Sequence, residues 1–462
     1  MDMTKDSLEL NLPQRPSLED LRNALSTYLS DERFDRVRDL LALLRPAEIA
    51  ALMAGLSGTH RNLLFDLSDP ERQHEIISEL EESDQEKLLD RLDEARIGEL
   101  LLQLDSDDAA DLAGLLDNST LQKVLEATPE EDRDEVVTLL EFEEDSAGGL
   151  MALELVTIKD TDTVGHAIIA LRKAKSAGIE DIHYVYVVDK KGRLKGRIEL
   201  YDLLLAKRSA PATEVLDEDM VVIGSDMDQE EVAQLFQRYD LISAPVVDEN
   251  DILIGRITVD DIVDVVTEEA SEDLGYLAGT GEEVVTERNL ILSTRARLPW
   301  LLLAFIGELV GAFVISSFEA HIANLLVIAS FIPVIIAVAG NIGIQSSTIV
   351  VRGLATGEIS SGHLVQRVSR EIVVSLMSGV VLAGVLIAVS LFWLHDPKIA
   401  LSLALSLVAV VIIAAAVGST VPFVLKSLNQ DPALASGPFI TMTNDVVGLF
   451  VYLMITTSIL AG

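Results

Sequence analysis

The sequence predicts a multidomain protein in four parts: an all-α superhelical N domain, an α/β pair of repeated modules, a connecting helix and an all-α domain of five membrane spans. The 462 residues hold 75 acids and 35 bases, yet 49% of the chain is apolar, and a soluble protein rarely combines the two. The two properties separate along the chain, since residues 298–462 hold only seven acids and five bases. An internal repeat in the charged region predicts the paired modules.

The negative charge belongs almost entirely to the first 297 residues, which hold 68 acids and 30 bases. Such an excess repels nucleic acid and attracts cations, so we expect no nucleic-acid partner. The chain has no cysteine, which excludes thiolate metal sites and leaves oxygen ligands for hard divalent cations. The first residues, MDMTKD, lack the apolar run of a secretory signal, and we expect this region to lie in the cytoplasm.

Five apolar stretches follow, near residues 298–318, 322–351, 372–394, 399–425 and 437–460. Each is long enough to cross a bilayer core of about 30 Å. Three arginines lie between the second and third stretches, whereas the first connection holds one glutamate and one histidine. The positive-inside rule places the arginine-containing loop in the cytoplasm. We therefore predict a multi-pass protein of the cell (plasma or inner) membrane with its N-terminus inside and its C-terminus outside.

Acids inside the predicted spans mark candidate functional sites, because a carboxylate at the bilayer centre costs at least about 2.5 to 3.5 kcal/mol on insertion scales. Asp445 follows Gly437, Pro438 and Thr441, so hydroxyl and carbonyl oxygens could face a water-filled lumen beside it. A hydrogen bond between helices is the alternative interpretation of Asp445. Glu308 either lines a pore or snorkels towards the interface.

Other polar residues in the spans allow two interpretations each. Asn341 and Gln345 lie in a glycine-rich stretch of the second span, where they either line a pore or bond between closely packed helices. Asp431 precedes Pro432 before the last span. It is either a metal ligand or the N-cap of a helix with proline at its first position.

Residues 17–142 predict a bundle of short amphipathic helices, because leucine-rich faces recur without strand alternation. Ser83 and Thr128 begin two capping-box patterns and therefore predict helix starts. The acids of this region are solvated faces unless another feature singles them out.

The internal repeat begins at Val187 and again at Val246, so that Gly196 matches Gly255 at a spacing of 59 residues. Each copy reads strand, helix, strand, turn, strand and short helix, with the longer helices near 164–175 and 229–239. This pattern closely resembles a tandem CBS pair, a regulatory module that often binds adenine nucleotides and dimerises. The resemblance covers residues 151–267.

A helical, acidic stretch follows the second copy, at residues 260–273, with acids at positions 261, 264, 268 and 272 along one face. Like charges at this spacing destabilise an isolated helix by a few tenths of a kcal/mol per pair, roughly. A bound cation would remove that penalty. An acidic linker helix in water is the alternative.

Taken together, these parts resemble the MgtE family of magnesium channels and transporters from end to end. The resemblance places the N domain at 1–142, the CBS pair at 143–267, the plug or connecting helix at 268–297 (starting near 260) and the pore domain at 298–462. Ala339 departs from the family, which usually has glycine there. The motifs that carry the resemblance are EEDSAGGLM (143–151), DQEE (228–231), GNIGIQ (340–345), VRGL (351–354) and DPALASGP (431–438).

The resemblance implies a homodimer that conducts magnesium along its two-fold axis. Asp445 would be the main ion-selecting carboxylate, alongside the backbone near Thr441. Opposed carboxylates suit Mg²⁺, which keeps several of its waters. The resemblance also implies that the connecting helix plugs the cytoplasmic mouth of the pore when internal magnesium is high. The implied sensing residues are Asp261, Asp264, Glu269, Glu272, Asp273, Asp228, Glu230, Asp240 and Asp431, with Asp107, Asp111, Glu75 and the carbonyl of Gly149 in the helical domain and its exit.

Three other classes compete with a channel. An ion-coupled transporter of Mg²⁺, Co²⁺ or another divalent cation is the main alternative, since midplane polar groups also suit that class. An enzyme is disfavoured because the chain lacks a phosphate-binding loop, a nucleophile elbow and HExxH spacing. A chloride channel with CBS domains is disfavoured by the acids of the pore. The sequence leaves open the preference among Mg²⁺, Mn²⁺ and Co²⁺, whether ATP binds the CBS pair, the sensing range and the role of Glu308.

Overall fold

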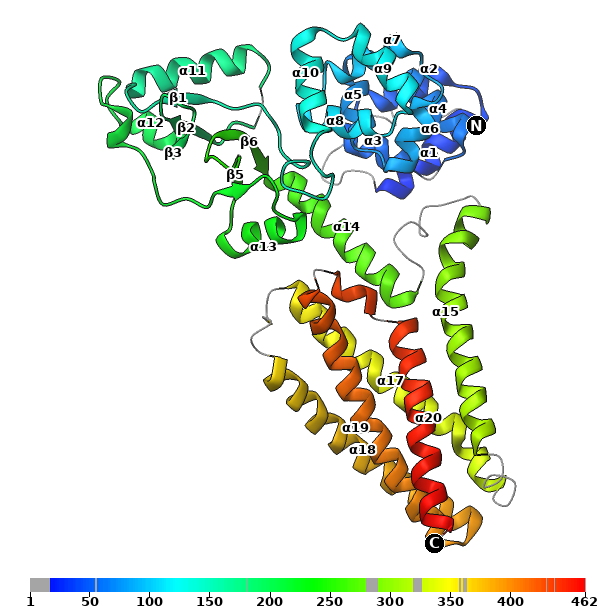
Figure 1. The fold of residues 1–462 in the computed structure, drawn as a ribbon. Helices are drawn as coiled ribbons and strands as arrows, with labels where there is room; N and C mark the ends of the chain where they lie inside the picture. The colour runs from blue at the N-terminus through cyan, green and yellow to red at the C-terminus, as the bar shows by residue number, and fades with distance from the viewer. Residues whose placement is uncertain are drawn as a thin grey trace. The chain divides into compact units, whose positions relative to one another are not determined.

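The computed structural model describes residues 17–461 except 55, 180, 280–289, 319–325, 357–358, 360–363, 429 and 436. The chain forms two compact units, residues 1–262 and 263–462. The first contains a helical domain and a pair of α/β repeats, and the second contains the long apolar helices (Figure 1). The predicted fold class is confirmed.

The N domain consists of short helices around one apolar core. Leucines of their inner faces, among them Leu25, Leu52, Leu64 and Leu88, are fully buried, as amphipathic helices require. The helices are α1 (Leu18–Ser30), α2 (Phe34–Leu41), α3 (Pro46–Met53), α4 (Gly58–Leu67), α5 (Gln73–Ser78), α6 (Glu82–Leu89), α7 (Glu94–Leu101), α8 (Ser106–Gly114), α9 (Asn118–Ala127) and α10 (Glu130–Leu139), with a short 3₁₀ helix at Pro70–Arg72.

Aspartates cap several of these helices. The side chains of Asp93 and Asp117 accept hydrogen bonds from the first turns of α7 and α9, which satisfies backbone donors that the helix leaves unpaired. Helices begin close to both predicted capping boxes, but the two predicted capping roles are wrong. α6 begins one residue before Ser83, and the Thr128 hydroxyl donates to the carbonyl of Val124 at 2.8 Å, so Thr128 ends α9 and does not cap α10.

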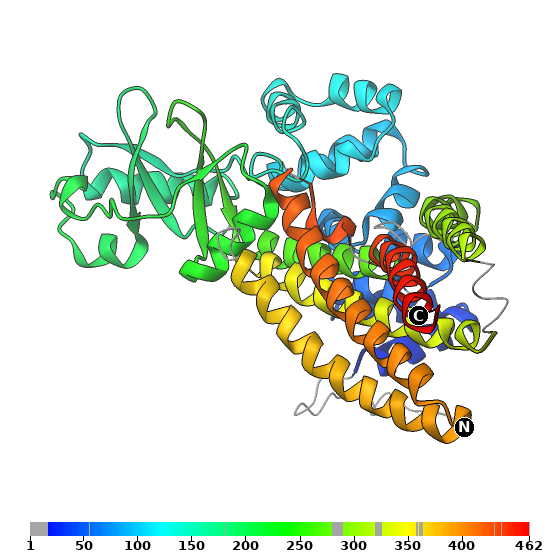
Figure 2. The same cartoon turned by 60° about the horizontal axis from the view of Figure 1, so that its bottom comes forward.

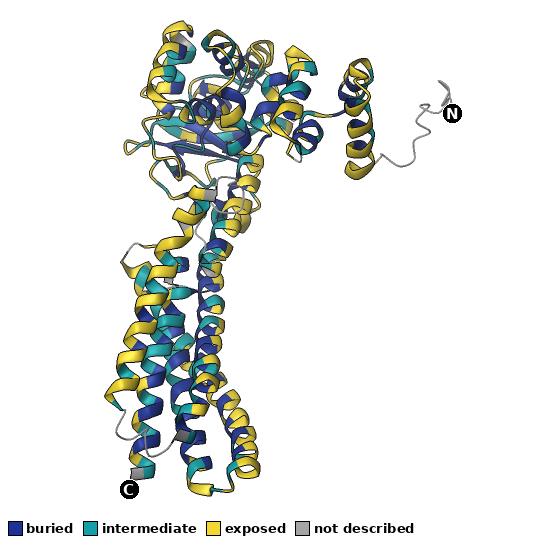
Figure 3. Cartoon of the chain, turned by 90° about the vertical axis from the view of Figure 1, so that its right-hand side faces the viewer, coloured by how far each residue is buried: buried dark blue, intermediate teal, exposed yellow. Residues whose placement is uncertain are grey.

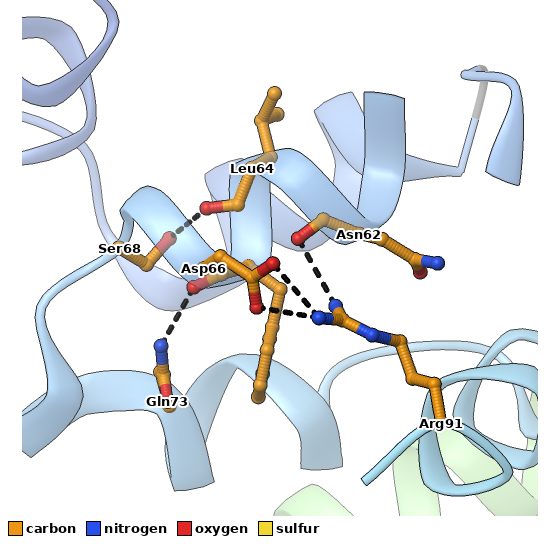
Figure 4. Close-up of polar contacts among 7 residues, drawn as sticks. Asn62, Leu64, Asp66, Ser68, Gln73 and Arg91 are labelled. Carbon is orange, nitrogen blue, oxygen red and sulfur yellow. Dashed lines mark hydrogen bonds and ion pairs between the residues drawn. The ribbon is translucent and has the colours of Figure 1, made fainter. Parts of the chain in front are cut away.

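Ion pairs between helices hold the N domain together, and two of them differ strongly in burial. Arg61 of α4 pairs with Asp84 of α6, and their side chains are only 3% and 9% exposed. Figure 4 shows a second, more exposed pair, in which Arg91 donates to both carboxylate oxygens of Asp66 at 2.9 and 2.8 Å. The buried pair matters more for stability, because a buried charge that loses its partner is costly.

The α/β pair repeats one three-stranded unit. β1 (Thr157–Lys159) runs parallel to β2 (Tyr184–Val188), and β2 pairs antiparallel with β3 (Leu194–Glu199). β4 (Ile223–Gly224), β5 (Ser243–Val247) and β6 (Leu253–Thr258) repeat this order and these directions. Gly196 and Gly255 occupy matching positions opposite Val187 and Val246. The helices are α11 (Val164–Ser176), α12 (Leu200–Leu205) and α13 (Gln229–Tyr239), with a 3₁₀ turn at Ala212–Glu214.

The second repeat leads directly into α14 (Val259–Ala278), the predicted acidic helix. Five long apolar helices follow, and Figures 1 and 2 show α18 and α19 side by side along their length. Residues 322–325 of the predicted second span lie outside the described residues. The helices are α15 (Leu290–Ser317), α17 (Leu326–Ala355), α18 (Leu364–Leu394), α19 (Pro397–Ser427) and α20 (Pro438–Ala461), and a 3₁₀ helix, η6 (Pro432–Ala435), precedes the last.

The surfaces of the five helices fit a bilayer. Each is long and apolar enough to cross one, and many residues on their outer faces are exposed (Figure 3). On α18 the exposed side chains include Val373, Met377, Val381 and Phe392. Such an apolar surface is stable in contact with lipid, whereas its exposure to water would be unfavourable.

We expect Asp84→Ala to destabilise the N domain by about 3 to 5 kcal/mol, because Arg61 would remain buried without a counter-ion. Hydrogen exchange of the full chain should show protection of the α4 and α6 amides falling by about 100-fold or more. The control is Asp39→Ala, whose carboxylate is 73% exposed and 3.9 Å from Arg36, and which should change little. Equal effects of the two substitutions would contradict a stabilising role of the buried ion pair.

Candidate functional site

Asp445 and Thr441 lie one turn apart on α20 and face α17 at Gly340. A Cβ added to Gly340 would lie 3.7 Å from Oδ1 of Asp445 and 3.8 Å from Cγ2 of Thr441. Oδ1 of Asp445 is buried and has no hydrogen-bond partner within the described chain, while the hydroxyl of Thr441 donates to the carbonyl of Gly437 at 3.0 Å. Because Gly340 carries no side chain, its backbone lies directly beside the carboxylate.

α15 contributes a second carboxylate to this place. Gly307 packs tightly on Met442, and a Cβ on Gly311 would lie 3.7 Å from Leu449, so α15 approaches α20 closely on both sides of Asp445. The side chain of Glu308 lies near the Asp445 carboxyl group and interacts with it. The structure therefore brings Asp445, Thr441 and Glu308 together.

Asn444, the neighbour of Asp445, was not predicted from the sequence. Its side chain is 2% exposed, packs tightly on Gly343 of α17, and neither its nitrogen nor its oxygen has a partner in the described chain. Gly418 of α19 in turn lies against the backbone of Gly343. The glycines of the second span thus allow close approach of three helices. The sequence signal that could have identified Asn444 is its position next to an intramembrane acid.

Asn341 and Gln345 lie apart from this group. They line a cavity of about 270 Å³ between α17 and α18, together with Ser375 and Glu371. Glu371 is 6% exposed and pairs with Arg367 at 3.2 Å. Asn341 and Gln345 are both exposed on the single chain.

A second acidic group forms where the end of α14 meets the start of η6. Asp431 accepts a hydrogen bond from the backbone of Ala433 at 2.8 Å, so the predicted capping role is present. Asp273 of α14 lies near this carboxylate and near Glu272. Burial is the main cause that raises the pKa of Asp273 to about 6, and the negative charge of Asp431 is the second. Gly279, just after α14, packs against Pro438 at the start of α20.

A third acidic group joins α8 to the start of α14 in the first unit. Desolvation, and then the charge of Asp261, raises the pKa of Asp107 well above its usual range and that of Asp108 to about 7. Asp261 accepts hydrogen bonds from the amide and hydroxyl of Thr258 at 3.1 and 2.7 Å. Burial nevertheless raises the pKa of Asp261 to about 6. These carboxylates are crowded, and a cation would relieve them.

Glu154 anchors this group and was missed from the sequence. Its carboxylate accepts hydrogen bonds from the amide and hydroxyl of Ser106 at 3.0 and 2.9 Å, and the amide of Leu153 donates to the same hydroxyl at 2.8 Å. The loop that carries Glu154 is therefore fixed to the N-terminus of α8. Sequence reasoning chose Asp107 from its motif but had no signal for a contact 48 residues away.

Several implied sensing residues have structural roles of their own. Asp228 caps α13 by accepting from the amide of Glu230 at 2.9 Å, and Asp240 ends the same helix with a left-handed backbone at φ 50°. Gly149 makes a tight turn, because a Cβ there would lie 2.5 Å from the carbonyl of Glu144.

The remaining implied residues lie nearer the surface. Asp111, Asp264 and Glu75 are exposed and Glu269 is partly exposed. Among the described residues, no set of three or more histidines, aspartates and glutamates is arranged to hold a metal ion. The donor chemistry suits magnesium, but a binding geometry within one chain is not present in the described part.

Comparison with known proteins gives the family. Residues 332–455 match the MgtE family of divalent cation transporters, residues 44–145 match the MgtE intracellular N domain, and residues 147–209 and 212–268 match CBS domains. The magnesium transporter MgtE of Thermus thermophilus is 35% identical over 447 residues, which is 96% of this chain and 99% of that protein. The chain belongs to the MgtE family.

Two further MgtE relatives agree with this. The magnesium transporter MgtE of Bacillus subtilis is 34% identical over 323 residues, 70% of this chain and 71% of that protein. A crystal structure of the cytosolic domain of the Mg²⁺ channel MgtE in complex with ATP covers 53% of this chain and 99% of its own, with 36% identity and a TM-score of 0.50. The MgtE relatives are transporters, not enzymes, and the five apolar helices make this chain a multi-pass membrane protein.

The packing around the acidic residues of α8 and the start of α14 should become less stable as the pH rises in the presence of a chelator. A carboxyl whose pKa is raised on folding contributes most stability below its ordinary pKa, and that contribution is lost as the pH rises through the folded value. For Asp261 this interval runs from 3.8 to about 6.

Protection factors of the α8 amides, corrected for the intrinsic exchange rate, should therefore fall between about pH 4 and about pH 7. Asp261→Asn keeps an acceptor for Thr258 but removes the charge, so its profile should be flatter. A wild-type profile that rises with pH, or an equally steep profile for the variant, would contradict the electrostatic origin.

Proposed function

We propose that this protein is a magnesium-selective, magnesium-gated homodimeric channel that mediates Mg²⁺ influx. The observation that carries the proposal is the meeting of Asp445, Thr441 and Glu308 inside the membrane-spanning helices α15 and α20. Carboxylates at this depth are kept for function, because lipid does not solvate them. The family and the name of the Thermus thermophilus relative support magnesium as the ion.

The proposed selectivity depends on hydration. Mg²⁺ gives up its waters reluctantly, so a carboxylate that accepts hydrogen bonds from those waters binds the ion without stripping it. Asp445 from each of two subunits would provide such acceptors on a two-fold axis. Asp445 Oδ1 has no partner within the described chain and is therefore available for this role.

The proposed gate uses the acidic groups of α14. When internal magnesium is low, Asp107, Asp261 and Asp273 repel their acidic neighbours, which favours a loose α14 and an open pore. When internal magnesium is high, carboxylates of different elements share ions and the closed state gains stability. The ion can shift this equilibrium only because it binds one state better than the other.

The proposed arrangement assigns residues 1–142 to the N domain, 143–267 to the CBS pair, 268–297 to the plug and 298–462 to the pore. The N-terminus lies in the cytoplasm and the C-terminus outside. Adenine nucleotide is a proposed second ligand of the CBS pair, supported by the 36% identity to a cytosolic domain whose structure contains ATP. Isothermal titration of the purified chain with ATP tests this, and no heat of binding would argue against it.

We expect Asp445→Ala to abolish magnesium uptake by the chain reconstituted in liposomes, with flux falling to that of protein-free vesicles. The physical reason is the loss of the carboxylate that holds the hydrated ion. Size-exclusion chromatography establishes that the variant remains assembled. Asp396→Asn is the control, since Asp396 caps α19 and asparagine caps equally well. Normal flux through assembled Asp445→Ala would remove Asp445 from the pore.

We expect neutralisation of five α14 acids to preserve conduction and weaken inhibition by internal Mg²⁺ by at least about tenfold in patch recordings. The substitutions are Asn or Gln at Asp261, Asp264, Glu269, Glu272 and Asp273. A control variant loses the same charge from exposed N domain acids, at Glu19, Asp35, Asp39, Glu126 and Glu141. Unchanged inhibition, or equal weakening in the control, would contradict the assignment of the α14 acids as the magnesium sensor.

A further inference from the structure

We propose that Glu308 is a second selectivity residue, whose carboxylate acts with that of Asp445 to make the site prefer a divalent cation over a monovalent one. This inference depends on the proposed conduction through Asp445 and adds a residue to it. It concerns a position for which the family resemblance gives no role.

The depth of Glu308 excludes snorkelling. It lies ten residues after Leu298 and nine before Ser317, so at about 1.5 Å per residue it is roughly 15 Å and 14 Å from the two ends of the apolar stretch. A bilayer core is about 30 Å thick, which puts Glu308 near its centre. A glutamate side chain is too short to reach either interface from there.

The packing of α15 fixes where this side chain goes. Gly307 lies tightly on Met442, and Gly311 lies over Leu449. The two glycines bracket Glu308 along α15 as Met442 and Leu449 bracket Asp445 along α20. This packing places the carboxyl groups of Glu308 and Asp445 beside one another. Small residues at this spacing bring helices close, and here the close approach pairs two acids.

The rest of Glu308 is exposed on the single chain. A carboxylate at the centre of a bilayer is rarely left against lipid, so the exposed side of Glu308 faces water or another subunit. Asp445 is half-buried, and its Oδ1 is buried where it faces Gly340. A lumen would therefore reach the pair of carboxylates from the exposed side of Glu308.

Charge balance gives the consequence for selectivity. The two adjacent carboxylates of each subunit carry two negative charges when ionised, and one divalent ion balances twice as much of this charge as one monovalent ion does. Removing the charge of Glu308 leaves Asp445 able to attract cations. It should therefore cost discrimination more than conduction.

The test is the reversal potential of the reconstituted full chain with Mg²⁺ on one side and K⁺ on the other. For Glu308→Gln we expect continued conduction and a fall of about tenfold or more in the permeability ratio of Mg²⁺ to K⁺. The control is Asp396→Asn, which removes one acid from the α19 cap and should leave the ratio unchanged. A ratio for Glu308→Gln within about twofold of wild type would overturn the inference.

A second variant keeps the inference testable if Glu308→Gln carries no current at all. Glu308→Asp retains the carboxylate, so it should conduct with a ratio nearer to wild type even if Glu308→Gln is silent. An assembled Glu308→Asp channel that is also silent would show that the side chain acts through packing and would overturn the inference. If wild type itself carries no Mg²⁺ current, the proposed function fails first, and the two failures are thereby distinguished.

Discussion

Repulsion between carboxylates is the constraint on which the architecture depends. The chain carries 75 acids against 35 bases, and the fold gathers some of these acids instead of spreading them. Asp107, Asp108 and Asp261 share one place in the first unit, and Asp273 and Asp431 share another in the second. Crowded acids of this kind make the packing of α14 sensitive to protons and to cations.

The membrane helices use the same chemistry under a different constraint. In lipid, backbone and side-chain polar groups must be satisfied within the protein, so an acid at mid-span marks a place where water or an ion enters. Glycines provide that place: Gly340 leaves space beside Asp445, and Gly307 brings Glu308 to it. Conduction and gating would therefore both depend on carboxylates. Conduction would use carboxylates in a lumen, and gating would use carboxylates between domains.

Sequence predicted the fold well because its signals are local. Apolar length gave the five spans, and the spacing of Gly196 and Gly255 gave the repeat, whose strands pair as expected. Long-range contacts could not be predicted: nothing in the sequence indicates that Glu154 binds Ser106, that Glu308 meets Asp445, or that Asn341 lies beside α18. The capping pattern at Ser83 failed because α6 already begins at Glu82, and the one at Thr128 failed because its hydroxyl bonds to the end of α9.

In the proposed mechanism, magnesium orders the α14 acids and thereby links ion concentration to the pore. Hydrogen exchange of the full chain measures this directly when magnesium is compared with a monovalent salt at equal ionic strength. We expect Mg²⁺ to increase the protection of the amides of α14 and of α8, and the monovalent salt to leave their protection unchanged. Equal protection by the two salts would contradict it, because general screening and not ion binding would then explain the response.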